Sequence, residues 1–185
     1  MKNEIQKLNT GLAISNKEDF VAKFDPVQMN KQLIGLRTMN DAIITDFNSM
    51  AVYRKEFGED TLLAVIEAHL LSLNISLNTH AKLDEHQVAE IAIEITRIYF
   101  HISIVEVHFV FRNAKRGIYG KIDYAINMPD VLLWFEKYEK ERMRHFMTKQ
   151  IDDQAQHKGY SERSEHIMEK ERHDKMVNER KNDEL

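Results

Sequence analysis

The sequence of 185 residues contains no cysteine, and it has only six glycines and two prolines. The missing cysteine excludes disulfides, zinc–thiolate sites, iron–sulfur clusters and thiol nucleophiles. A β-sandwich or β-barrel needs many more turn-forming residues than this chain contains. The composition therefore favours a helical protein.

Long apolar runs are also missing. No stretch approaches the ~18 uninterrupted apolar residues of a membrane span. Residues 1–20 carry charges throughout and lack the apolar core of a signal peptide. Without such a peptide, the final four residues, 182–185, do not indicate retention in the endoplasmic reticulum. We therefore expect a cytoplasmic protein with no membrane partner.

Charge is distributed unevenly along the chain. Charged residues make up 30 % of the sequence and the net charge is −4. Residues 112–149 contain nine Lys and Arg against five Asp and Glu, whereas residues 1–111 and 150–185 are both acidic overall. A basic segment inside an acidic protein can mark contact with a polyanion, although a solvated face is the commoner explanation.

Apolar side chains recur at steps of three and four residues, which is the pattern of amphipathic helices. Start and stop signals divide this pattern into predicted helices at residues 16–24, 26–54, 59–77, 84–99, 103–115 and from about 130 onward. We predict an all-α fold, a compact bundle of about five to six helices over residues 16–150. Residues 1–15 are predicted to be a flexible segment, and residues 151–185 a charged tail, extended or helical.

Residues 104–112 are ambiguous between strand and helix. Apolar residues alternate there in the manner of a strand, at positions 105, 107, 109 and 111. Against a strand, Ser103 and Glu106 match a helix capping box, and Gly117 stands where a helix would end. A single strand would also have no partner. Together, the capping box, Gly117 and the lack of a partner strand predict a helix over residues 103–115.

No pattern in the sequence indicates catalysis or metal binding. The nine histidines include no H-x-x-x-H or H-E-x-x-H spacing, and the chain has no G-x-S-x-G motif and no phosphate-binding P-loop. His69, on an apolar helix, is more often a core or boundary residue than a ligand. We therefore expect no enzyme activity, no catalytic residue, no cofactor and no metal.

The turn at residues 112–121 concentrates basic side chains around two glycines. If it contacts nucleic acid, four cations would meet phosphate and an aromatic ring would stack on a base; these candidates are Arg112, Lys115, Arg116, Lys121 and Tyr119. The alternative is structural. In that case Tyr119 packs on the core and the cations complement the negative end of the preceding helix.

Residues 98–142 resemble a family of small proteins from Bacteroidetes phages and mobile elements. The shared pattern is a tyrosine, an apolar helix, a basic G-x-[YF]-G-K turn, and a helix with W-[FL]-x-x-Y-x-x-x-R, here Trp134 to Arg142. The layout is also similar to phage helicase loader and inhibitor proteins, which pair a helical domain with a flexible helicase-contacting tail.

These resemblances imply a DNA-replication accessory protein in a bacterial host cell. Its partners would be single- or double-stranded DNA and a replicative helicase or another phage or host protein. The tail cations that would meet such a protein are Arg163, Lys170, Arg172 and Arg180.

A second hypothesis makes the chain a protein-interaction or structural phage component that binds no nucleic acid and can form a homo-oligomer. It would use aromatics near Trp134 and Tyr138, if these are exposed and not packed in the core. The effect of salt on DNA binding distinguishes the two hypotheses. Only phosphate contact predicts an affinity for DNA that falls steeply as the salt concentration rises.

Overall fold

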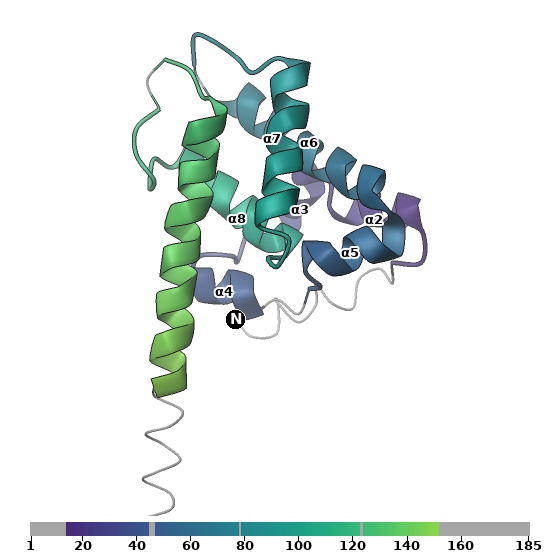
Figure 1. Ribbon diagram of the computed structural model, residues 1–185, viewed down its shortest axis with the longest axis vertical. Coiled ribbons are helices and arrows are strands. Elements are labelled where there is room, and N and C mark those ends of the chain that lie inside the picture. The colour runs from purple at the N-terminus through teal and green to yellow at the C-terminus, as the bar shows by residue number, and fades with distance from the viewer. Residues whose placement is uncertain (1–13, 45–46, 78, 123, 152–185) are drawn as a thin grey trace, which may run out of the picture. The chain divides into compact units, whose positions relative to one another are not determined.

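The computed structural model describes residues 14–44, 47–77, 79–122 and 124–151 (Figure 1). Within these ranges the regular structure is helical, and an isolated antiparallel bridge joins Ser49 to Ser103. Seven helices are α2 (Lys17–Lys23), α3 (Pro26–Gln32), α4 (Met39–Ile44), α5 (Met50–Phe57), α6 (Glu59–Ser76), α7 (Glu85–Ile98) and α8 (Ile104–Lys115). An eighth covers residues 128–151. The predicted all-α class is confirmed.

The chain divides into two compact units, Met1–Lys140 and Glu141–Leu185. In the first unit the description begins at residue 14, and in the second it covers residues 141–151, all of them helical. The predicted charged tail therefore lies almost wholly outside the described residues. Its boundary at residue 151 and the predicted boundary at residue 16 stay predictions.

The segment predicted as one helix over residues 26–54 forms three helices, α3, α4 and α5. Its apolar spacing misled because the same stripe continues through the turns, where Leu33 and Leu36 are buried. A new helix start lies inside the stripe: Asp41 Oδ2 accepts hydrogen bonds from the amides of Arg37 and Thr38 at 2.9 and 2.8 Å. This division is why the described residues contain more helices than expected.

Helix α6 is the centre of the first unit, since it packs against α2, α3, α5, α7 and α8. Its inward side chains include Leu62, Ile66, Leu70 and Leu73, all fully buried. Burying one such side chain stabilises the fold by roughly 1.5–3 kcal/mol. The high apolar content of residues 59–77 thus matches the five helices that pack around α6.

Aromatic rings join α2 to α5. Phe20 lies 4.7 Å from Phe57 and 5.0 Å from Tyr53, centroid to centroid, and Phe24 lies 5.3 Å from Tyr53. Each of these four side chains is at most 6 % exposed. The short α2 is stabilised by this cluster far more than by its own backbone hydrogen bonds, because isolated helices of two turns are not stable in water.

The first turn of α5 is capped by backbone from another part of the chain. Ser49 makes no side-chain cap there. Instead the amide of Met50 donates to the carbonyl of Ile102, and that of Ala51 to Phe100, both at 2.8 Å. The start of α5 and the start of α8 are therefore held together, with two otherwise unpaired donors satisfied.

The helix predicted over residues 103–115 is confirmed, with both hydrogen bonds of the Ser103–Glu106 capping box present. Every residue from 102 to 111 is buried, on all sides of the helix. This burial explains the misleading alternation, because a helix enclosed on every side needs apolar residues on every side.

Residues 128–140 pack on α7 and α8. Tyr138 donates its hydroxyl proton to Glu106 Oε1 at 2.7 Å, and the ring of Phe135 stacks on that of Tyr99 with centroids 5.0 Å apart. Trp134 and Tyr138 are only 4 % and 1 % exposed. The hypothesis that these two aromatics form an exposed interaction surface is therefore wrong.

Three later apolar residues of this helix, Met143, Phe146 and Met147, continue its helical spacing past Tyr138. In the second unit they are 56 %, 38 % and 58 % exposed. Helical spacing places them on one face, but spacing alone does not reveal whether anything covers that face.

Candidate nucleic-acid interface

The basic turn after α8 has a backbone path fixed by two glycines. The amide of Ile118 donates to the carbonyl of Asn113 at 3.1 Å and that of Gly117 to Ala114 at 2.9 Å, which together make a Schellman motif. Gly117 has φ 74° and Gly120 has φ 129°, angles that other residues adopt only with strain. The side chains from 115 to 121 are therefore presented on a defined turn.

Tyr119 is buried, with 4 % of its side chain exposed, so it is not available to stack on a base. Its backbone carbonyl also accepts a hydrogen bond from Lys137 Nζ. The neighbouring apolar side chain, Ile118, is 60 % exposed. Tyr119 thus anchors the turn to the core, which corrects its predicted role as a stacking platform.

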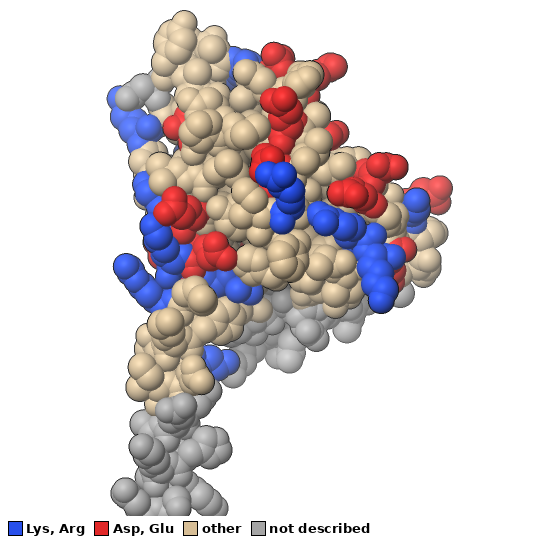
Figure 2. Space-filling view, viewed as in Figure 1, with Lys and Arg blue, Asp and Glu red and all other residues tan. Residues whose placement is uncertain are grey.

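Lys115, Arg116 and Lys121 are exposed at this turn. Figure 2 shows positive side chains on the loop between α8 and the helix that begins at residue 128. Partial burial lowers the pKa of the Lys115 ammonium below its ordinary value. These three predicted cations can therefore reach an external phosphate, and their contact with nucleic acid stays a prediction.

Arg112 differs from the other three cations. Its Nη1 donates to the carbonyl of Leu33 at 3.1 Å, and the guanidinium lies 5.8 Å from the ring centroid of Phe109. Its Nε and Nη2 are buried. The geometry turns Arg112 toward the interior, so it does not support the predicted contact with DNA.

Two buried histidines approach each other beneath Arg112. The rings of His69 and His108 lie 5.4 Å apart, and His69 Nε2 is 2.9 Å from the carbonyl of Phe24. A carbonyl only accepts, so Nε2 of His69 carries a proton. Burial lowers the pKa of His69 to about 4 and, helped by neighbouring cations, that of His108 to about 3. Both rings are therefore neutral at pH 7.

Sequence reasoning missed this pair because the two histidines belong to different helices, α6 and α8. The available signal was two histidines on helices predicted to be buried. Spacing along the chain, which guides the search for metal ligands, gave no indication that they meet.

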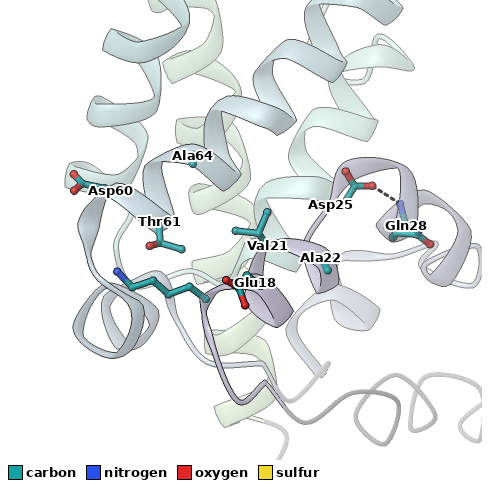
Figure 3. A pocket seen from close by; sticks show the side chains of 9 residues that line it. Glu18, Val21, Ala22, Asp25, Gln28, Asp60, Thr61 and Ala64 are labelled. Carbon is teal, nitrogen blue, oxygen red and sulfur yellow. Dashed lines mark hydrogen bonds between the residues drawn. The ribbon is translucent and has the colours of Figure 1, made fainter.

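An open groove of about 740 Å³ lies between α2, the start of α3 and α6 (Figure 3). Val21, Ala22 and Ala64 supply its apolar surface, and the charged residues around it are Lys17, Glu18, Asp25 and Asp60. The Asp25 carboxylate is already engaged, because it accepts from the amides of Val27 and Gln28 at 3.0 Å each. In this groove Asp25 thus serves as the N-cap of α3.

Within the described part of the chain, no group of three or more His, Asp and Glu is placed to hold a metal ion. The same residues include no helix with the length and apolarity needed to cross a bilayer. The predicted partner-binding cations Arg163, Lys170, Arg172 and Arg180 lie outside the described residues. Comparison of the chain with protein-family models, curated proteins and solved structures gave no match.

Proposed function

We propose that the protein is a non-enzymatic accessory protein that binds DNA through phosphate contacts at the turn that ends α8. Lys115, Arg116 and Lys121 supply the positive charge. The observation that carries the proposal is the fixed path of the turn, with Gly117 and Gly120 at positive φ and Tyr119 buried beneath it. Cations on such a turn meet phosphate without the entropic cost of ordering a loop.

The exposed side chains of the turn are better suited to contact the DNA backbone than to recognise bases. Lysine and arginine contacts to phosphate position a protein without reading sequence. Because Tyr119 is buried, the turn offers no aromatic platform for unpaired bases. We therefore propose binding with little sequence preference, at least as tight to double-stranded as to single-stranded DNA.

Fluorescence anisotropy with labelled single- and double-stranded DNA at two salt concentrations tests the proposal. Three phosphate contacts predict a log–log slope of roughly −2.7 for a duplex, which is about a forty-fold loss of affinity between 50 and 200 mM salt. The double variant Arg116→Glu/Lys121→Glu is expected to abolish this binding.

The matched control is Lys31→Glu/Lys55→Glu, which changes the net charge equally at exposed positions on α3 and α5. If both double variants lose binding to the same extent, the turn has no special role and general charge explains the affinity. Absence of binding to either DNA at low salt would sink the proposal.

The proposed setting is DNA replication of a phage or mobile element, with a replicative helicase as protein partner. The sequence resemblance of residues 98–142 supports the phage or mobile-element setting, and the similar layout of phage helicase loader and inhibitor proteins supports the helicase partner. A purified helicase that binds the native chain but not an Arg163→Glu/Lys170→Glu/Arg172→Glu/Arg180→Glu variant would support this setting.

A second candidate function is protein interaction without nucleic acid, including self-association. One observation favours it: in residues 141–151 exposed apolar side chains recur at steps of three and four residues, at Met143, Phe146, Met147 and Ile151. Sedimentation equilibrium of the native chain beside Met147→Lys tests self-association. If the native chain and the variant are both monomeric and DNA binding is salt-sensitive, the result favours DNA binding over self-association.

A further inference from the structure

A small, partly open cavity lies between α3, α6 and α8, with Arg112 in its lining. Its free volume of about 10 Å³ is enough for a single small occupant. Its lining combines four cationic or imidazole groups with two neutral polar ones and two apolar rings; the residues are Pro26, Asn30, His69, Ser72, His108, Phe111, Arg112 and Lys115. No carboxylate is among them.

Three buried nitrogen atoms in this lining have no hydrogen-bond partner among the described residues: His108 Nε2, Arg112 Nε and Arg112 Nη2. His108 is only 5 % exposed. Leaving a buried polar group unpaired costs about 1–3 kcal/mol, and more when the group is charged. Three such atoms around one cavity indicate an occupant that accepts hydrogen bonds from them.

The charge of the lining decides what kind of occupant fits. Arg112 has no ion pair within the described ranges, and Lys115 adds a second positive charge at the exposed side of the cavity. The nearest carboxylates act from outside the lining: Asp41 on Arg112 and Asp25 on His69. Both already accept two backbone amides each.

We propose that this cavity binds one small monovalent anion of chloride or bromide size, held by Arg112, His108 and Lys115. A monatomic anion accepts from all three unpaired nitrogens at once and offsets the guanidinium charge. A water molecule can satisfy the hydrogen bonds but adds no negative charge to the partial compensation that Asp41 supplies. Oxyanions such as sulfate and phosphate are too large for the space. Ser72 and Asn30 complete the contact with their polar side chains.

Thermal unfolding of the full chain tests the proposal, with sodium gluconate replaced stepwise by sodium chloride or bromide at constant ionic strength. A ligand that binds only the folded state raises Tm along a saturating curve. We expect a rise of roughly 4 °C that levels off below 0.2 M halide. A linear dependence on halide, or none, would overturn the proposal and assign the cavity to water.

The decisive variants are Arg112→Gln and its matched control Arg116→Gln. Both remove one guanidinium from the same end of α8, but Arg116 does not line the cavity. The halide-dependent rise in Tm is expected to vanish in Arg112→Gln and to persist in Arg116→Gln. Equal halide dependence in the two variants would contradict the assignment.

Arg112→Gln also removes the hydrogen bond to Leu33 and can fail to fold, so a measurement on the native chain stands beside it. Chloride-35 resonance broadening, relieved by added bromide, is expected if one saturable site exchanges with solvent. Broadening that bromide does not relieve would overturn the proposal. DNA binding is measured separately, so the failure of this site leaves the proposed function untouched.

Discussion

His69 and His108 are two buried side chains whose protonation couples to folding. Their folded pKa values, about 4 and about 3, lie below the ordinary value of 6.5 chiefly because both rings are buried. The unfolded chain therefore binds protons more readily as pH falls. The contribution of each ring to stability is complete above about pH 6.5 and is lost progressively toward pH 4.

Because the unfolded chain takes up these protons at higher pH than the folded chain, acid favours unfolding. We predict that the free energy of unfolding falls between pH 7 and pH 5 by on the order of 2 kcal/mol for each histidine. Urea unfolding at the two pH values measures it. His108→Gln is expected to flatten the dependence, whereas His86→Gln, at an exposed position, is not. An unchanged slope in His108→Gln would show that other groups carry the effect.

Tyr119 and Ile118 are neighbours in the chain that differ sharply in burial. Tyr119→Ala is expected to cost about 3 kcal/mol in the free energy of unfolding, because it empties a buried site. Ile118→Ala is expected to cost less than about 0.5 kcal/mol, because that side chain is largely exposed. Urea unfolding of the two variants checks both values, and similar losses would refute the buried placement of Tyr119.

At the scale of elements, the capping boxes of α7 and α8 are alike in sequence position and different in setting. Gln87 at the start of α7 is exposed, whereas Glu106 at the start of α8 is buried and also accepts from Tyr138. Removing Glu106 deprives two buried donors, the Ser103 amide and the Tyr138 hydroxyl, of this acceptor.

We therefore predict that Glu106→Ala costs about 3 kcal/mol in the free energy of unfolding and Gln87→Ala no more than about 1 kcal/mol. Chemical denaturation of the two variants measures the difference. A small loss in Glu106→Ala would mean that its bond to Tyr138 contributes little to holding residues 128–140 against α8.

Sequence signals located helices well where the chain carries its own start signal. Asp84 and Ser103 begin α7 and α8 at the predicted places, each with a side-chain oxygen on an amide three residues later. Periodicity failed between residues 26 and 54, because buried turn residues continued the apolar stripe across two breaks. Local capping by Asp41 decided the outcome there.

At the scale of the whole molecule, the all-α class followed from composition, but the sites depend on contacts between distant segments. The basic turn was visible in the sequence because its cations are neighbours along the chain. The anion cavity was not, since Pro26, His69 and Arg112 come from three different helices. Sequence patterns describe each helix, whereas a cavity is a property of the way helices pack.

The backbone cap of α5 has a consequence for the order in which the chain acquires its structure during synthesis. Met50 and Ala51 donate to carbonyls of Ile102 and Phe100, which the ribosome adds long after α5 itself. A nascent chain that ends before these residues lacks the acceptors for the first turn of α5. Helix α5 therefore cannot reach its final state as soon as it leaves the ribosome, and its first turn becomes complete only once the residues before α8 have been made.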